Sequence, residues 1–349
     1  MTLSPQLLPI LCFFAVIALI DCVDSASMKF YLVPECPYEH NEINKNTITF
    51  FDRLRNMTSL TSYQTTINNA DYCLTSYSCL WSNDVKAHIE YYCKKIVVIN
   101  LQPFVSRKLL RVISSDGPKY HVLFSNCRYV RNDIDICAPL FPKVICQPND
   151  YNRRYSVSFK GTVYLSGEGM FRYQMKLLNQ TPNSYVHFSC NTRTNIDNMY
   201  NHSVKSVSLD KECNQFNSSY FSTTDYCSTL NATFVLTPGG RQPSSYRFYD
   251  ALSVGAIPIP YYDRHDVNVP LPYHRTVDWT RCTKIFTEIY DIERFILTDQ
   301  EQVRQLIDNC REIYNTHFGT MENILTSWNK ELTAVFSYTN ITYSMYKFF

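Results

Sequence analysis

The order of apolar segments predicts an α/β protein with two domains. Short extended runs alternate with amphipathic segments, which is typical of parallel strands joined by helices. The 349 residues are enough for two domains of ordinary size. A polar, proline-containing segment over residues 147–154 separates two such series. We therefore predict one domain over residues 28–150, a second over 151–336, and a tail over 337–349.

The first half of the chain contains a regular series of predicted elements. Extended runs predict strands over residues 29–34, 70–77, 96–101, 120–124 and 143–146. Helical patterns predict helices over residues 46–56, 84–92 and 105–115. The run Ile96–Leu101 is apolar without alternation, as expected of a strand buried on both faces.

The second half repeats the alternation. Strands are predicted over residues 155–161, 185–189, 234–236, 256–262 and 284–289. Helices are predicted over residues 171–178, 300–314 and 321–336, with a further helix after residue 245. Residues 191–222 are polar and irregular, so we interpret them as an insertion or exposed loop.

One strand–loop–helix–strand unit is predicted over Ala232–Tyr262. A short apolar strand is followed by the loop Pro238-Gly239-Gly240. Ser244 and Ser245 are good N-cap residues for the next helix, and Gly255 is expected to end it. Extended chain then resumes, so the unit is a βαβ element.

The start of this helix is predicted to bind an anion, because its free N–H groups and its dipole present positive charge there. Arg241 in the loop and Arg247 in the first turn add to that charge. Asp250 follows near Arg247 on the helix surface, where its carboxylate could accept hydrogen bonds from ribose hydroxyls. The alternative is that Arg247 and Asp250 simply pair with each other on a surface helix.

The same residues resemble the donor-binding half of the exostosin family of glycosyltransferases. The stretch TFVLTPGGRQPSSYRFYDALSVGAIPIP, with VDW at residues 277–279, is similar to the family pattern FCLxPxGxxxxSxRxxEALxxGCIPV and its downstream aspartate-tryptophan. Asp250 stands where the family usually has Glu, and Ala256 where it usually has Cys. The resemblance is good over residues 155–335 and patchy over 29–146.

The resemblance implies a GT-B architecture, in which two Rossmann-like domains face each other across a cleft. It also implies an inverting glycosyltransferase that uses a nucleotide-sugar donor, expected to be a UDP-sugar, and a glycan acceptor of the glycosaminoglycan or heparan sulfate type. Another exostosin-like subunit is an implied partner. The first domain would be the acceptor side and the second the donor side.

Nine residues are candidates for binding the nucleotide-sugar donor. Lys160 lies in a strand that resembles the family's fxFrG segment, and Arg172 lies on the family's Arg position. The full candidate set is Arg247, Asp250, Ser244, Ser245, Arg241, Gly239, Gly240, Lys160 and Arg172. Helix N–H groups together with Arg or Lys can stabilise a diphosphate leaving group without a metal, so no metal and no cofactor is expected.

The general base is less clear than the donor site. His121 matches a His of the family's GrdHf segment in the acceptor-side domain and is the candidate; its alternative role is a structural hydrogen bond. Asp133 and Asp135 have the DxD spacing that metal-dependent GT-A enzymes use, but they lie in the wrong half, so we interpret them as a loop. The residues Asp263, His265 and Asp266 are likewise interpreted as an exposed loop rather than a metal cluster.

Several features predict a secretory-pathway protein, luminal in the Golgi or ER, or secreted. The apolar run Leu7–Ile20 predicts a signal peptide over residues 1–26, with a short type II anchor as the alternative. Twelve cysteines follow it, an even number that predicts disulfides; Cys73–Cys79 and Cys282–Cys310 are candidate local pairs, and the remaining connectivity is open. The predicted glycosylation sites are Asn56, Asn179, Asn201, Asn217 and Asn340.

Charge excludes one class of partner. The formal net charge is +2 and there is no basic block, so nucleic acid is not expected as a partner. A second function class stays open beside the enzyme: a catalytically inactive glycan-binding or partner subunit on the same fold, which the Asp250-for-Glu difference and the divergent first half suggest.

Overall fold

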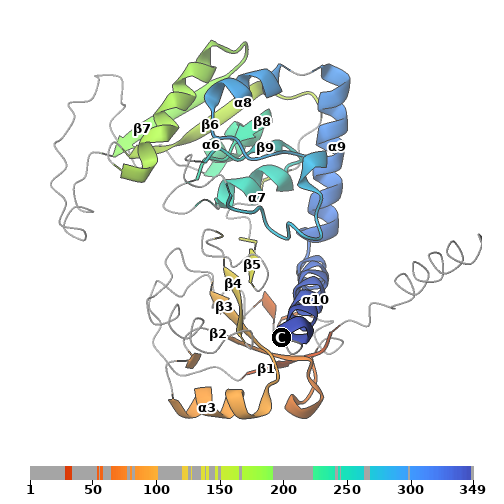
Figure 1. Cartoon of the computed structure of the whole chain (residues 1–349). Coiled ribbons are helices and arrows are strands. Elements are labelled where there is room, and N and C mark those ends of the chain that lie inside the picture. The colour runs from red at the N-terminus through yellow and green to blue at the C-terminus, as the bar shows by residue number, and fades with distance from the viewer. Residues whose placement is uncertain are drawn as a thin grey trace, which may run out of the picture.

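The structure is a computed structural model of the whole chain. It describes residues 28–33, 53–54, 56–57, 64–76, 79–80, 83–100, 120–124, 127, 135–137, 139–140, 146–147, 151–164, 167–191, 223–239, 243, 245–262, 268–297 and 299–346. Within these residues the chain forms two parallel sheets in separate domains, one above the other in Figure 1. The predicted α/β class with two parallel-sheet domains is confirmed.

The N-terminal sheet has five parallel strands in the order β1-β2-β3-β4-β5. The strands are β1 (Phe30–Leu32), β2 (Tyr72–Ser76), β3 (Ile96–Asn100), β4 (Tyr120–Phe124) and β5 (Ile136–Cys137). Val97 and Ile99 face one hydrophobic cluster, and Ile96 and Val98 face another, so β3 is buried on both faces as predicted. The helix α3 (Asn83–Tyr92) supplies Ile89 to the second cluster.

The C-terminal sheet has four parallel strands in the order β7-β6-β8-β9. Its strands are β6 (Tyr155–Tyr164), β7 (Tyr185–Asn191), β8 (Ala232–Leu236) and β9 (Ile257–Ile259). The helical elements around it are the 3₁₀ helix η7 (Gly167–Gln180) and the α-helices α6 (Thr223–Leu230), α7 (Tyr246–Ser253), α8 (Ile289–Ile296) and α9 (Gln300–His317). The neighbours Phe234 and Val235 point into different clusters, so β8 is also buried on both faces.

One prediction in this domain is wrong. Residues 284–289 contribute one isolated bridge, between Tyr261 and Phe286, and helix α8 begins at Ile289. Residues 171–178 are helical as predicted, but they belong to the longer 3₁₀ helix η7. The segment 105–115, predicted as a helix, and most of 191–222 lie outside the described residues.

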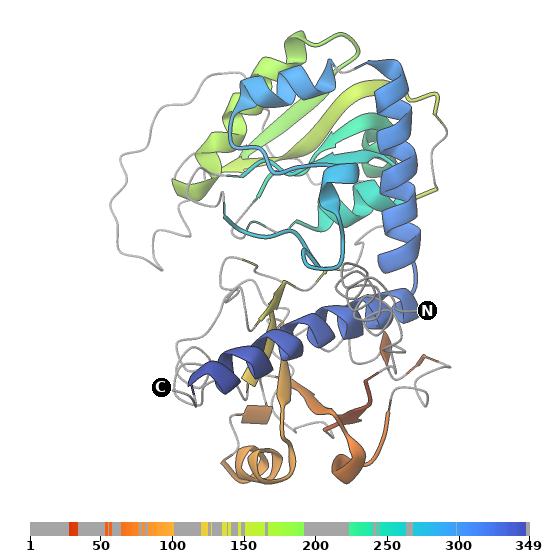
Figure 2. The same ribbon diagram turned by 45° about the vertical axis from the view of Figure 1, so that its right-hand side comes forward.

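The last helix crosses back to the first domain. Helix α10 (Met321–Tyr346) follows α9 and lies across the N-terminal sheet in Figures 1 and 2. The Tyr72 hydroxyl donates to the Asn329 side-chain oxygen at 2.9 Å. The centre of the Phe336 ring lies 6.2 Å from that of Tyr72 and 4.6 Å from that of His121. Residues of the second domain contact this helix too, since the Tyr273 hydroxyl donates to the Ile324 carbonyl at 3.2 Å, and the assignment of residues 321–336 to the second domain stays a prediction. The helix also continues past residue 337, where a tail was predicted.

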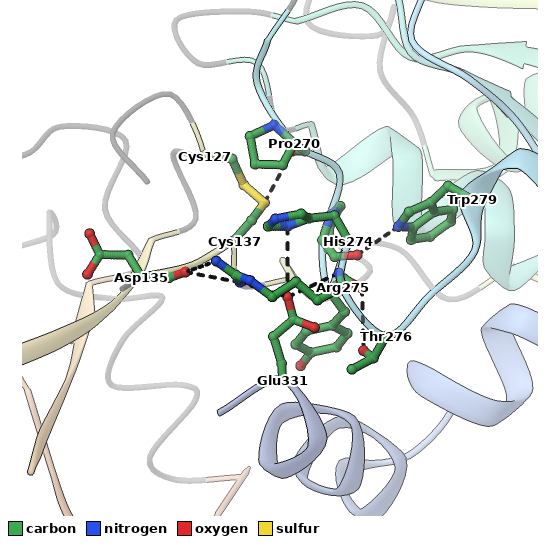
Figure 3. Close-up of polar contacts among 11 residues, drawn as sticks. Cys127, Asp135, Cys137, Pro270, His274, Arg275, Thr276, Trp279 and Glu331 are labelled. Atoms are coloured by element: carbon green, nitrogen blue, oxygen red, sulfur yellow. Dashed lines mark hydrogen bonds and ion pairs between the residues drawn. A yellow bond between two sulfur atoms is a disulfide. The ribbon is translucent and has the colours of Figure 1, made fainter. Parts of the chain in front are cut away.

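A group of polar side chains joins the two domains at this crossing (Figure 3). Glu331 on α10 is fully buried and pairs with Arg275 at 3.0 Å. The Arg275 guanidinium also donates to the backbone carbonyl of Asp135, next to β5 of the first domain. We call Arg275, Glu331 and the Asp135 carbonyl the domain junction. His274 lies beside it, with its Nδ1 3.8 Å from a Glu331 carboxylate oxygen.

Four disulfides are described: Cys73–Cys93, Cys127–Cys137, Cys146–Cys227 and Cys282–Cys310. The predicted Cys282–Cys310 pair is confirmed. The predicted Cys73–Cys79 pair is wrong, because Cys73 bonds to Cys93 where the end of α3 returns to the sheet. Disulfides of this number fit an oxidising compartment.

The predicted signal or anchor segment lies outside the described residues, as do Asn201 and Asn217. Within the described part of the chain, no helix is long and apolar enough to span a membrane. Asn56 and Asn179 are exposed, and Asn340 lies on α10. The Asn179 side chain exchanges two hydrogen bonds of 3.1 Å with the Val186 backbone, so its amide also ties η7 to β7.

Candidate functional site

The predicted strand–loop–helix–strand unit is present as β8, α7 and β9. The loop leaves β8 alongside β9, because the Thr237 and Gly239 N–H groups donate to the Ile259 and Tyr261 carbonyls, both at 2.9 Å. Ser245 is the N-cap residue of α7 by backbone conformation, although its side chain makes no capping hydrogen bond. The unit therefore places the start of α7 at the carboxyl end of the sheet.

Gly255 ends α7 as predicted. Its φ of +70° is a conformation that glycine adopts at low cost. The N–H groups of Gly255 and Ala256 donate to the Leu252 and Ala251 carbonyls, which satisfies the last turn of the helix. A β-carbon at this position would also lie 2.5 Å from the Arg311 side chain, which would have to shift.

Arg247 lies in the first turn of α7 and reaches the carboxyl-terminal half of β6. Its guanidinium carbon lies 4.5 Å from the centre of the Phe159 ring and 5.7 Å from that of Tyr226. It donates a hydrogen bond to the Lys160 carbonyl. Gly161 makes room for this arrangement, because a β-carbon there would lie 3.2 Å from an Arg247 nitrogen and 2.6 Å from Phe159. The guanidinium is thus held by flat ring contacts and one carbonyl.

Asp250 is not on the helix surface, where the sequence placed it. It is 1% exposed, and its carboxylate accepts a 2.7 Å hydrogen bond from the Tyr226 hydroxyl on α6. A buried carboxyl group needs such a donor, because burial without hydrogen bonds is costly. In this structure Asp250 therefore binds the Tyr226 side chain inside the protein, and direct contact with a ribose stays a prediction.

The two other predicted cations lie at the same end of the sheet. Lys160 is 7% exposed on β6 opposite His187, and burial followed by the Lys160 charge lowers the pKa of His187. Arg172 on η7 donates at 2.7 Å to the Gly239 carbonyl, so it holds the loop after β8. Thr237, where β8 ends, has a buried hydroxyl with no hydrogen-bond partner among the described residues.

The structure thus brings Arg247, Lys160, Arg172, Gly239 and Ser245 to one end of the C-terminal sheet. The candidates Arg241, Ser244 and Gly240 lie outside the described residues, so their roles stay predictions. This end of the sheet is cationic and has a helix start beside it, the combination that suits a phosphate group.

His121 lies far from that set, on β4 of the other domain. It is 1% exposed, and its ring contacts Phe336 of α10 edge-on. In this structure His121 therefore packs in the core, and both its role as the general base and its alternative role in a structural hydrogen bond stay predictions. Asp135 is also buried; it accepts a 3.0 Å hydrogen bond from the Val122 N–H, a structural role consistent with the loop interpretation of the DxD pair. Asp133, Asp263, His265 and Asp266 lie outside the described residues.

Tyr226 and Phe159 are site residues that sequence reasoning missed. Phe159 had a sequence signal, because it precedes Lys160 in the predicted strand. In the structure its ring lies next to Gly161. Tyr226 had no such signal, because α6 follows a long polar segment and was not predicted as a helix. Only the fold shows that Tyr226, in the middle of α6, contacts Asp250 of α7.

Together these features define an α/β protein with two parallel-sheet domains and a cationic helix start at the strand ends of the second. No family model matches the chain. It is 27% identical to Exostosin-1 of Drosophila melanogaster over 214 residues, which are 56% of this chain and 26% of that protein. It is 27% identical to the Exostosin-1 homolog of Caenorhabditis elegans over 177 residues, which are 49% of this chain and 43% of that protein. The resemblance to exostosins is confirmed.

Two limits apply to these similarities. The chain spans less than half of the length of the curated relatives it matches, 26% for the Drosophila protein and 43% for the Caenorhabditis elegans protein. Among solved structures, TarM superposes with a TM-score of 0.42 at 10% identity, covering 75% of this chain and 54% of that one. A likeness this distant says nothing about activity.

Proposed function

We propose that this protein is an exostosin-like inverting glycosyltransferase that transfers a sugar from a nucleotide-sugar, a UDP-sugar, to a glycan acceptor. The observation that supports this most directly is the Arg247 guanidinium held at the carboxyl end of β6, beside the start of α7. The glycan acceptor is of the glycosaminoglycan or heparan sulfate type, and a second exostosin-like subunit is the partner.

The chemistry follows from where negative charge develops. When the sugar leaves, the diphosphate gains charge, and fixed N–H donors and guanidinium groups at that point lower the barrier. Arg247 provides a planar donor group, and the α7 start provides backbone N–H groups. Arg172 holds the loop between them through the Gly239 carbonyl. These groups would stabilise the leaving group without a metal.

The acceptor side is less defined. An inverting reaction needs a general base close to the acceptor hydroxyl. His121 is the candidate from the resemblance, and it would need to leave its contact with Phe336 to serve. The proposed location is the lumen of the Golgi, which agrees with the four disulfides.

A second candidate function is a catalytically inactive partner subunit that binds glycan. Two observations favour it. Asp250, which stands where exostosins usually have Glu, lies on the buried face of α7. The candidate base His121 is buried against α10. Such a subunit would keep the fold and lose turnover.

The test is a donor screen on the purified protein. UDP release is measured with UDP-glucuronic acid, UDP-xylose and other UDP-sugars, with and without EDTA, and UDP binding is measured by calorimetry. Release from one donor that persists in EDTA supports the proposal. Release that EDTA abolishes would overturn metal independence alone. No release and no UDP binding would favour the inactive subunit.

A further inference from the structure

Tyr226 connects the two charged residues of α7. Its hydroxyl donates to the Asp250 carboxylate at 2.7 Å, and its ring lies 5.7 Å from the Arg247 guanidinium carbon. Burial raises the pKa of Tyr226, the nearby Arg247 charge lowers it, and Asp250 raises it, in that order of size. The hydroxyl therefore stays protonated and lies within the field of both groups.

Three contacts hold the part of α6 that carries Tyr226. The next residue, Cys227, forms the disulfide to Cys146. The Thr229 hydroxyl donates to the Tyr226 carbonyl at 2.6 Å, and the Ser158 hydroxyl on β6 donates to the Thr229 carbonyl. Helix α6 is thus tied to the same strand whose Lys160 carbonyl receives the Arg247 hydrogen bond.

These contacts form a continuous support under the guanidinium. Phe159 covers one part of it and the Lys160 carbonyl orients one nitrogen, while Tyr226 joins it to the buried Asp250. Arginine has many rotamers, and holding it in one before a ligand arrives reduces the entropy lost on binding. Without the tyrosine hydroxyl, the buried carboxylate would lose the donor that lies between it and the guanidinium, and its charge would draw the guanidinium from its place.

We propose that Tyr226 is a positioning residue that holds Arg247 toward the diphosphate by engaging Asp250 from below. The inference rests on the proposed function. It deepens that function by assigning Asp250 an indirect role: the carboxylate anchors Tyr226 and does not touch the ribose.

The test compares UDP with uridine, which lacks the phosphates. Calorimetry on wild type and Tyr226→Phe should show the UDP dissociation constant rising on the order of ten-fold, as expected for one hydrogen bond to a charged group. The uridine dissociation constant should stay within about two-fold. Tyr314→Phe is the matched control: Tyr314, on α9, also lies in the field of Asp250, which raises its pKa after burial does, and no hydrogen bond joins the two.

A second variant keeps the test valid if Tyr226→Phe folds poorly. Tyr226→Phe/Asp250→Leu removes both groups of this hydrogen bond, so the carboxylate is not left buried without the tyrosine donor. It should lose UDP affinity to the same extent and retain uridine affinity. Retained UDP affinity in either variant would overturn the inference, and so would a parallel loss of uridine, which marks a general structural role or a ribose contact. If wild type binds neither ligand, the proposed function fails and the inference fails with it.

Discussion

Two arginines in this protein lie close to buried carboxylates, and their surroundings differ. Arg275 at the domain junction donates directly to Glu331 and to the Asp135 carbonyl, so its donors join α10 and the first domain to the second. Arg247 lies on the rings of Phe159 and Tyr226, while the carboxylate of Asp250 is engaged by the tyrosine hydroxyl.

The difference separates structure from function. A guanidinium paired with a carboxylate contributes to stability, and breaking such a pair leaves a buried charge. A guanidinium held by rings and a carbonyl has no carboxylate bound directly to it in the described part of the chain, which suits the anion-binding role that we propose for Arg247. The identity of the residue is the same in both places, and the arrangement around it decides the role.

The largest expected effect is on the junction. Arg275→Ala leaves the Glu331 carboxylate buried without its cation, so we expect a loss of about 3–5 kcal/mol in unfolding free energy, measured by chemical denaturation. Arg275→Met/Glu331→Leu should recover most of that loss. Equal stability of Arg275→Ala and wild type would contradict the assigned role.

The second effect concerns UDP binding by Arg247, the other arginine of the comparison. Arg247→Ala should weaken UDP binding about a hundred-fold, or about 2.7 kcal/mol, because the cation opposite the phosphates is lost. Its melting temperature should change by less than about 3 °C. Arg281→Ala is the control, since Arg281 forms an exposed pair with Glu312 in the same domain. A large loss of stability in Arg247→Ala would make Arg247 structural like Arg275.

The third effect concerns pH at the junction. Burial, followed by the Arg275 charge, lowers the pKa of His274 to about 4. The unfolded chain has a His pKa of about 6.5, so it binds more protons than the folded chain between these values. Stability therefore falls as the pH drops from about 6.5 toward 4, by about 1–2 kcal/mol between pH 7 and 5.

The measurement for His274 is urea unfolding at the two pH values. His274→Gln should reduce the pH dependence, and the exposed His88→Gln should not. A His274→Gln variant with the wild-type pH dependence would show that another group controls it.

The smallest effect tests the space under Arg247. In Gly161→Ala the new methyl group would meet the Phe159 ring and an Arg247 nitrogen, so both must shift. We expect UDP affinity to fall about three- to ten-fold at nearly constant stability. Gly319→Ala meets backbone atoms only at ordinary contact distances and should leave UDP affinity unchanged. Unchanged affinity in Gly161→Ala would mean that Arg247 need not lie against β6.

The sequence predicts local elements better than contacts between distant segments. Strand β3 and the Gly255 helix end follow from apolar runs and from backbone preferences, which are local properties. Nearness in sequence suggested Cys282–Cys310 correctly and Cys73–Cys79 wrongly, and it gave no sign of Cys146–Cys227, so the spacing of cysteines alone does not determine their pairing. Residues 284–289 look like a strand because their apolar composition suits one, but among the described residues they form one isolated bridge, from Phe286 to Tyr261 just after β9.

The candidate site shows the same limit. Arg247 was readable from its place after a glycine loop, but the burial of Asp250 was not, because it depends on where α6 lies. Tyr226 is 24 residues from Asp250, and no local pattern links them.

The path of α10 has a consequence for how the chain is made. The described part of the first domain begins at residue 28, yet some of its core residues are covered by α10, which reaches residue 346. During synthesis Tyr72 and its neighbours therefore lack this cover until α10 has emerged. A stop codon ahead of Asn329 would therefore destabilise the first domain. A fragment that ends at residue 150 would lack the same cover and would be less stable than this domain in the intact chain.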